Sequence, residues 1–369
     1  MENTSQDIFY QKTAYRLVVL ALLITFMVLA RELLIPLLIA LLFAFLLLPV
    51  CARLERWRLP RWLSALLAVS IAVIIFGGLV FFLSTQVISF IEDWPRLQEK
   101  AEQKLNTLYS FVREQFNISK REQQDWINKQ LENESDTAGK LLVKVFSFTG
   151  TFFVNLGLIP LYMFFFLLYR GKLKHFLVAV IRSSEQQHTL RIVQKVTEVS
   201  QKYLKGILID ILLLAILAST GYLLLGLQHA ILFGVTVALF NLVPYVGVLT
   251  GGALPVLMAI LTKDEISYAL GAAAVSMTVQ FLDNNFITPN IVGRSVSINP
   301  LTALIALVIF AMIWGIPGMV LSIPLTGMIK VVCDNVEPFK PIGILIGENV
   351  DAKRRSKLFR FRRKRAEKK

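Results

Sequence analysis

Long uninterrupted apolar runs are the feature that most limits how this chain can fold. Four are clear, over residues 17–30, 33–52, 63–84 and 145–169. About 20 apolar residues in a helix, at 1.5 Å each, cross a hydrocarbon core of about 30 Å. The core offers no water to backbone amides and carbonyls, so a single run can satisfy them only as a helix. The sequence predicts an all-α, polytopic membrane protein.

Composition agrees with this prediction and excludes a nucleic-acid-binding domain. Hydrophobic residues make up 55% of the chain and charged residues 17%, which is too few charges to cover a soluble surface. The net charge is +14, but residues 353–369 hold eleven Lys or Arg against one Glu. The rest of the chain is therefore close to neutral and has no basic face for nucleic acid. The basic tail either binds anionic lipid or only sets the topology, and both readings explain its charge.

Loop charges orient the predicted spans. The linkers 53–62 and 170–205 carry an excess of Lys and Arg, whereas the stretch 85–143 has slightly more acidic than basic residues. Loops rich in Lys and Arg remain in the cytoplasm. We therefore expect both termini to be cytoplasmic and the stretch 85–143 to lie outside, in a bacterial inner membrane.

Five regions follow from these patterns: three spans (1–84), an extracytoplasmic amphipathic helical insertion (85–143), a fourth span with a cytoplasmic amphipathic connector (144–206), a transport region (207–337) and a cytoplasmic basic tail (338–369). In the insertion, apolar residues recur in steps of four and three at Ala101, Leu105, Leu108 and Val112. This helix either pairs with another helix through that seam or lies on the membrane or its own span.

Residues 207–335 are apolar but are repeatedly interrupted by Gly and Pro. Proline removes a backbone donor, so the freed groups need partners in the protein or in water. Broken helices at membrane depth are typical of transporters, where they line a cavity. The alternative is kinked helices that use glycine for close packing.

The few polar residues of this region are the candidate site. Asn241 stands three residues before Pro244, where its amide can cap a half-helix or bind a ligand. Asp283 is followed by Asn284 and Asn285. A second group follows a Pro/Gly turn and comprises Arg294 and Asn299.

Three charged residues in this set are costly at membrane depth. Each costs at least about 2.5 kcal/mol there, so such residues usually mark a substrate or proton path. Asp283 and Arg294 flank the turn and can pair across a hairpin, or they can anchor a loop at the interface. Asp210 near the start of its span is either a second buried acid or a helix-entry charge.

The order of these motifs resembles the autoinducer-2 exporter family. The string from Asn241 to Gly247, then the string from Asp283 through Pro289 to Gly293, and then Asn299-Pro300-Leu301 carry the resemblance. It implies about eight spans with re-entrant elements, cytoplasmic termini and a homo-oligomer. It also implies secondary export of small molecules, although some relatives exchange sodium or lithium for protons.

The resemblance also implies roles for single residues. Asp283 occupies the acidic position, Arg294 the basic position after the turn, and Asn241 with Pro244 the Asn-x-x-Pro position. In the mechanism we expect, Asp283 responds to protons or cations with Arg294 as its counter-charge. Asn241, Asn284 and Asn285 then offer neutral donors and acceptors to a polar substrate.

We therefore expect a secondary transporter that exports a small polar molecule such as autoinducer-2. Because the sequence contains no phosphate-binding loop for ATP, we expect a gradient to drive transport. The alternatives are a sodium or lithium/proton antiporter, a passive pore and a non-transporting scaffold. An enzyme is not expected, because metalloprotease and serine-hydrolase motifs are absent. Three His and two Cys without a cluster predict no metal and no cofactor.

Overall fold

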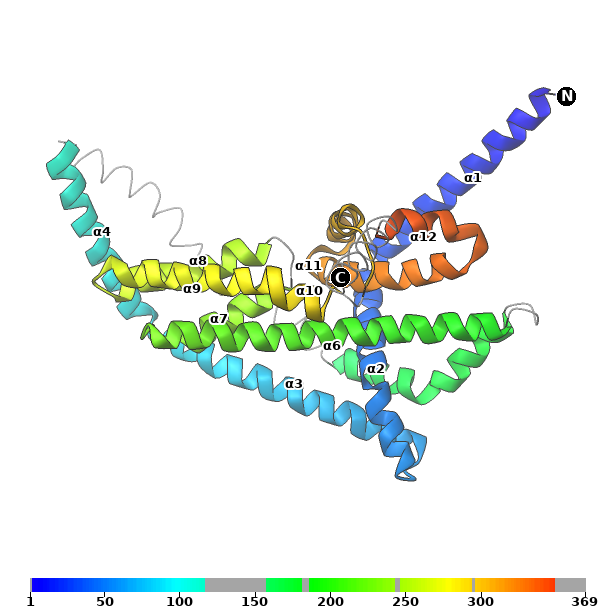
Figure 1. The fold of residues 1–369 in the computed structure, drawn as a ribbon, viewed down its shortest axis with the longest axis horizontal. Coiled ribbons are helices and arrows are strands. Elements are labelled where there is room, and N and C mark those ends of the chain that lie inside the picture. The colour runs from blue at the N-terminus through cyan, green and yellow to red at the C-terminus, as the bar shows by residue number, and fades with distance from the viewer. Residues whose placement is uncertain (1, 117–156, 181–185, 243–245, 294–295, 349–369) are drawn as a thin grey trace, which may run out of the picture. The chain divides into compact units, whose positions relative to one another are not determined.

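The computed structural model describes residues 2–116, 157–180, 186–242, 246–293 and 296–348. These residues are overwhelmingly helical, with no strand and only one isolated bridge between Ile298 and Gly347. The all-α prediction is confirmed. The helices (Figure 1) are α1 (Glu2–Leu29), α2 (Arg31–Arg56), α3 (Arg61–Glu92), α4 (Trp94–Phe116), an unlabelled helix over residues 157–179, α6 (Gln186–Leu224), α7 (Ala230–Phe240), α8 (Val246–Thr262), α9 (Ile266–Leu282), the π-helix η2 (Asp283–Ile287), α10 (Thr288–Ile291), α11 (Pro300–Asn335), the 3₁₀ helix η3 (Glu337–Phe339) and α12 (Lys340–Ile346).

Four of the described helices, α2, α3, α6 and α11, are long and apolar enough to cross a membrane. Shorter apolar helices accompany them, including α7. Large apolar side chains on these helices are exposed, as at Phe81 and Met312. In water such a surface would be unstable, whereas lipid covers it without cost. The chain is a multi-pass membrane protein.

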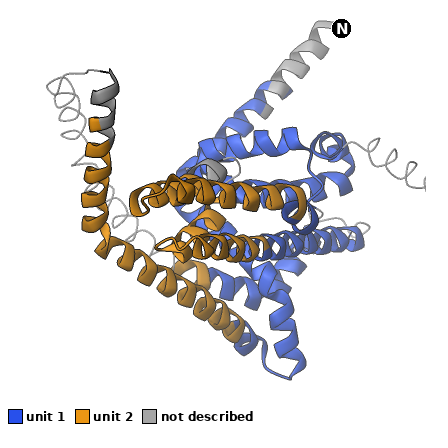
Figure 2. Ribbon diagram, turned by 60° about the vertical axis from the view of Figure 1, so that its left-hand side comes forward, with its two compact units in different colours: residues 1–65, 162–209, 287–369 blue, residues 66–161, 210–286 orange. Residues whose placement is uncertain are grey.

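The chain forms two compact units, coloured separately in Figure 2. Unit 1 comprises residues 1–65, 162–209 and 287–369, and unit 2 comprises residues 66–161 and 210–286. The boundaries fall inside α3, the helix over residues 157–179, α6 and η2, so both units are assembled from segments distant in the sequence. Each unit therefore contains parts of several of the regions expected from the sequence.

Unit 1 packs around Trp314, Leu321, Leu42, Tyr203 and Leu204. The indole N–H of Trp314 donates to the carbonyl of Met27 at 2.9 Å, which satisfies the polar atom of an otherwise apolar ring. These contacts join α11 to α1, α2 and α6.

The joint between α1 and α2 is a bend at Ala30 (Figure 1). From the sequence alone, two apolar runs separated only by Arg31 and Glu32 predict a tight helical hairpin, and this prediction is wrong. The backbone instead continues the helical hydrogen bonds through the joint, from Ala30 N–H to Phe26 and from Leu34 N–H to Ala30. No Gly, Pro or Asn is present there to reverse the chain, so α2 continues away from α1.

The chain turns sharply inside α11 at Gly315, whose φ of 65° and ψ of −141° lie outside the helical region. A side chain is strongly disfavoured at these angles, so glycine is required. Two residues follow before Gly318, which lies directly against the carbonyl of Phe310 across the turn. In a straight helix residues 310 and 318 would be about 12 Å apart. The sequence prediction of broken helices in this region is therefore confirmed at Gly315.

Candidate functional site

The pair of helices α7 and α8 positions the first candidate residue, Asn241. At 11 residues, α7 is only about 16 Å long, roughly half of the hydrocarbon core. The helix ends at Asn241, and α8, which begins at Val246, packs against α7. The two helices form a hairpin, and Asn241 lies at the end of α7 that leads to α8.

The second candidate, Asp283, is positioned by a change in helix type. It ends the α-helix α9 and begins the π-helix η2, whose wider turn is rare and frequently found at functional sites. Its side chain is buried, with 3% of the residue exposed. The amide Nδ2 of Asn241 donates to Oδ2 of Asp283 at 2.9 Å. This hydrogen bond joins the end of α7 to the π-helix.

The third member is Asp210 of α6, of which 6% is exposed. Its carboxyl lies close enough to Asp283 and Asn241 to interact electrostatically with both. Its Oδ1 is buried and has no hydrogen-bond partner among the described residues. Two neighbouring carboxyl groups repel each other when both are ionised, so a proton on one of them relieves the repulsion. We call Asp210, Asn241 and Asp283 the acid-pair cluster.

The amide of Gln280 extends this cluster along α9. Its Nε2 lies 3.4 Å from Oδ2 of Asp283 and donates to Oδ1 of Asn284 at 3.1 Å. Gln280 was not among the candidate site residues of the sequence, although its spacing of three and four residues from Asp283 and Asn284 was visible there. Asn285 lies apart from the cluster, because its amide donates to the carbonyl of Phe281 in the same helix at 2.9 Å.

The acid-pair cluster lies deep along all three of its helices. The turn between α6 and α7 lies beside the turn between α8 and α9, since a Cβ on Gly226 would be 3.4 Å from Nζ of Lys263. From these turns the cluster is about 21 Å down α6, about 16 Å down α7 and about 25 Å down α9. Three separate segments therefore bring a polar residue to a similar depth in an apolar bundle.

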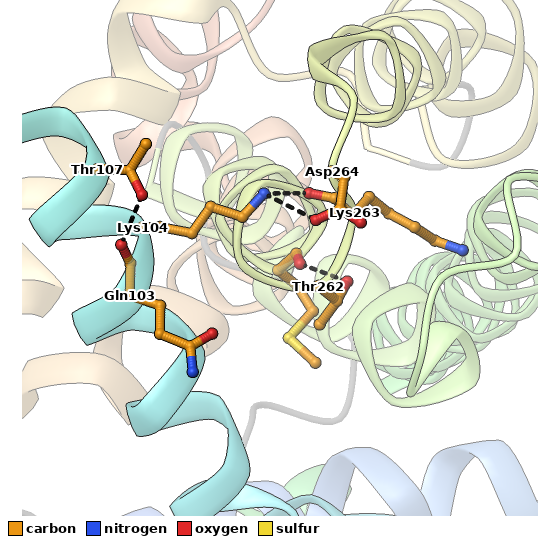
Figure 3. A network of polar contacts seen from close by, with 7 residues as sticks. Gln103, Lys104, Thr107, Thr262, Lys263 and Asp264 are labelled. Atoms are coloured by element: carbon orange, nitrogen blue, oxygen red, sulfur yellow. Dashed lines mark hydrogen bonds and ion pairs between the residues drawn. The ribbon is translucent and has the colours of Figure 1, made fainter. Parts of the chain in front are cut away.

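Polar contacts also hold the end of this bundle near the two turns. Nζ of Lys104 on α4 donates to the carbonyl of Lys263 at 2.6 Å and lies 3.5 Å from Oδ1 of Asp264 (Figure 3). Nε2 of His229, at the start of α7, lies 3.0 Å from Oδ2 of Asp93. These contacts hold the end of α8 against α4 and the start of α7 against Asp93, the residue between α3 and α4. Histidine and lysine at these positions were not singled out by the sequence.

Three other predicted site residues are not seen in the acid-pair cluster. Pro244 and Arg294 lie outside the described residues, so the pairing of Arg294 with Asp283 stays a prediction. Asn299 belongs to unit 1, where its Oδ1 caps α11 by accepting from Thr302 N–H at 2.8 Å. Its amide donates to the carbonyls of Leu345 and Gly347. The role of Asn299 seen in the structure is to fasten the start of α11 to the end of α12.

No group of three or more His, Cys, Asp or Glu side chains that could hold a metal ion occurs in the described part of the chain. The acid-pair cluster offers two carboxyls and an amide. Such a set can exchange a proton or form polar contacts with a small ligand or a monovalent cation.

Comparison with known proteins places this architecture in a family. The family model described as "AI-2E family transporter" matches residues 17–337. YueF of Bacillus subtilis, named as a candidate transport protein, is 28% identical over 320 residues, covering 83% of this chain and 84% of the relative. A candidate transport protein of Haemophilus influenzae is 23% identical, covering 88% and 93%. PerM of Escherichia coli, a candidate permease, is 27% identical, covering 81% and 86%. All elements of the acid-pair cluster lie inside the matched residues.

Proposed function

The chain belongs to the AI-2E family of membrane transporters, and from that premise we propose that it is a gradient-driven secondary transporter that exports a small polar molecule. The observation that carries the proposal is the acid-pair cluster. Asn241, at the tip of a half-length hairpin, donates to the buried Asp283, which also interacts with the buried Asp210. Buried polar side chains that link a hairpin to neighbouring helices can respond to a ligand by rearranging.

In the proposed cycle, proton exchange at the acid pair controls the hairpin. With one proton shared between Asp210 and Asp283, the pair is stable and Asn241 remains bound. Loss of that proton leaves two like charges in contact, which favours separation of the carboxyls or entry of a compensating partner. Arg294 is the compensating charge expected from the sequence. Asn241, Asn284 and Gln280 then offer donors and acceptors to a polar substrate of the autoinducer-2 type.

A specific observation favours one alternative, a sodium or lithium/proton antiporter. Two carboxyls in contact, with one buried oxygen of Asp210 unpartnered among the described residues, form the start of an oxygen cage for a small cation. Such a cage would bind the cation in exchange for the shared proton. The two mechanisms differ in cargo and have the acid pair in common.

Reconstitution into sealed liposomes tests the proposal. An imposed pH gradient, an internal pH dye and counterflow of radiolabelled candidates would screen sodium, lithium and polar metabolites. We expect wild-type protein to couple proton movement to one of them, and Asp283→Asn to stop it while remaining folded. Coupling to sodium or lithium alone would favour the antiporter, flux without gradient coupling would favour a pore, and no flux at all would leave a scaffold as the better account.

We also propose that the protein resides in a bacterial inner membrane with both termini in the cytoplasm, and that it assembles from several copies. The positive linkers 53–62 and 170–205 support this orientation, and the resemblance to the exporter family supports assembly. Labelling of single cysteines from each side of intact cells tests the orientation. Mass measurement of the detergent-solubilised protein tests the assembly.

A further inference from the structure

The turn between α2 and α3 gathers exposed aromatic and basic side chains. Residues 57–60 join the two helices, and both helices are long and apolar enough to cross a membrane. A turn this short between two such helices lies at the membrane surface. Trp57 and Trp62 are 75% and 54% exposed. Beside them in the sequence lie four exposed arginines, Arg53, Arg56, Arg58 and Arg61. We call these six residues the arginine–tryptophan turn.

The four arginines have no carboxylate of their own unit as a counter-charge. The one acidic residue of this stretch, Glu55, instead accepts hydrogen bonds at both carboxylate oxygens from Arg170, on the helix over residues 157–179. Within the described part of the chain, no ion pair or hydrogen bond involves the side chains of the four arginines. Four exposed guanidinium groups, each able to bind a phosphate through two hydrogen bonds, therefore stand at one membrane surface.

Arg58 adopts a strained backbone conformation at the end of α2. Its φ is 65°, in the left-handed region where a glycine commonly follows the last turn of a helix. Its N–H donates to the carbonyl of Glu55 at 3.0 Å, which closes the end of the helix. A glycine would adopt this geometry with less strain, so the local fold gives no reason for an arginine. The position therefore points to a use of the guanidinium outside the fold.

The start of α3 adds backbone donors to the same turn. The first hydrogen bond of this end runs from Ser64 N–H to the carbonyl of Pro60 at 3.0 Å. The N–H groups of Arg61, Trp62 and Leu63 precede it and have no backbone acceptor among the described residues. Such amides at the start of a helix favour a phosphate group. Tryptophan is enriched where lipid headgroups meet acyl chains, so the exposed indole rings suit the same ligand.

We propose that the arginine–tryptophan turn binds the headgroup of an anionic phospholipid in the adjacent leaflet. The guanidinium groups and the first amides of α3 bind the phosphate, and the two indole rings lie at the boundary between headgroups and acyl chains. Four positive charges without a counter-charge favour a headgroup of net negative charge over a zwitterionic one. The proposal does not depend on transport, and the turn belongs to unit 1, whereas the acid-pair cluster belongs to unit 2.

Hydrogen exchange of the full-length protein in nanodiscs tests this site. The discs contain either phosphatidylcholine alone or an equal mixture of phosphatidylcholine and phosphatidylglycerol. We expect amides over residues 57–64 to exchange at least about threefold more slowly in the mixture, and high salt to reduce the difference. The turn over residues 263–265, which joins two other apolar helices, should exchange equally in both discs and is the internal control.

The variant Arg58→Gly separates lipid binding from folding. It removes one guanidinium and relieves the positive φ, so its thermal stability in phosphatidylcholine should be unchanged or higher. The slowing of exchange by phosphatidylglycerol should nevertheless be smaller than in the wild-type protein. A fall in stability together with unchanged slowing would contradict the role given to Arg58.

Two triple variants and a matched control test the charge of the turn. Arg56→Gln with Arg58→Gln and Arg61→Gln should abolish the slowing by phosphatidylglycerol, whereas lysine at the same three positions should retain it. The control replaces three exposed lysines of the linker 170–205 and should keep the slowing: Lys172→Gln, Lys174→Gln and Lys205→Gln.

Equal exchange of residues 57–64 in the two discs, measured on the wild-type protein, would overturn the proposal without any variant. So would slowing that persists in the triple Gln variant, or slowing that the lysine control also loses, because diffuse charge would then be its cause. Slowing that appears only after RNA or an acidic protein is added would assign the turn to another partner and overturn it as well.

Discussion

The two units of this molecule bury charge in opposite ways. In unit 1, the guanidinium of Arg170, on the helix over residues 157–179, hydrogen-bonds both carboxylate oxygens of Glu55 on α2, and its Nη1 lies 3.1 Å from Sγ of Cys51. In unit 2, two carboxyls, Asp210 and Asp283, meet each other and an amide. One arrangement combines opposite charges and the other combines like charges.

The two contacts should respond differently to a change in pH. An Arg–Glu pair satisfies both partners over a wide pH range, so it stabilises one geometry and has no reason to change. Outside the membrane spans the same logic holds for Glu337, where a hydrogen bond from Lys340 lowers the pKa of the carboxyl. Two acids in contact are stable only while a proton is shared, so their geometry depends on protonation. In the proposed cycle, the acid pair is therefore the place where a gradient acts on the structure.

The largest effect is expected at Asp283. Asp283→Asn keeps the shape and the contact with Asn241 but removes the site that gains and loses charge. Coupled flux should fall by about 100-fold, at the upper end of coupling free energies between sites. Thermal stability should be nearly unchanged, because Asn has the shape of Asp and can still accept a hydrogen bond from Asn241. The measurement is proton-coupled flux in liposomes, normalised to folded protein. Asp264→Asn, at an exposed carboxyl, is the matched control and should transport normally.

A charge swap tests the unit 1 half of the comparison. Glu55→Gln or Arg170→Gln should each lower the free energy of unfolding by about 1–3 kcal/mol, since the remaining partner is left partly buried without its counter-charge. The exchange Glu55→Arg with Arg170→Glu should recover much of that loss. Thermal unfolding in detergent measures both. A large drop in flux per folded molecule in the single variants would show that this pair also takes part in transport.

Replacing Asn241, at the end of α7, should reduce transport less than replacing Asp283. Asn241→Ala removes the donor to Asp283 and should raise the substrate or ion concentration for half-maximal flux by about tenfold. This corresponds to about 1.4 kcal/mol, within the range for one typical intramolecular hydrogen bond. Asn285→Ala is the matched control, because the Asn285 amide donates only within its own helix among the contacts described here. If both variants behave alike, Asn241 has no special role.

The smallest effect is expected at Lys104, which contacts the turn between α8 and α9. Lys104→Met removes the hydrogen bond to the carbonyl of Lys263, and should destabilise the protein by no more than about 0.5 kcal/mol because the ammonium is partly exposed. Hydrogen exchange in the turn over residues 263–265 should become faster, with flux nearly intact. Asp264→Asn should have even less effect on exchange, since the carboxylate is fully exposed.

Much of the fold could be predicted because the length of an apolar run and the positions of Gly and Pro determine local structure. The runs at 33–52 and 63–84 became α2 and α3, and the amphipathic spacing from Ala101 to Val112 became α4. The sequence left open whether that helix pairs with another helix or lies on the membrane or its own span. In the structure α4 packs on α8 of its own unit, with Leu97 buried and Leu105 exposed. The bend at Ala30 was not predicted, because two adjacent apolar runs have the same pattern whether the chain reverses or continues.

The site was predictable as a set of residues but not as an arrangement. Asp210, Asn241 and Asp283 were each conspicuous as polar residues among apolar ones. Which of them meet depends on how three helices lie side by side, and this information is not contained in the spacing along one helix. Asn299 has the same polar chemistry, yet its position directly before Pro300 makes it a helix cap. Gln280 shares a helical face with Asn284 and lies one turn before Asp283, so the sequence did contain the signal for it, although it was not included among the candidate site residues.

The most direct test of the account is the protonation of the acid pair itself. Infrared difference spectroscopy of the membrane-reconstituted protein, between two pH values, reports the C=O stretch of a protonated carboxylic acid. The account predicts such a band in wild-type protein at neutral pH, its loss in Asp210→Asn with Asp283→Asn, and its persistence in Glu55→Gln. A wild-type spectrum identical to that of the double variant would contradict the shared proton, and with it the central role of the acid pair.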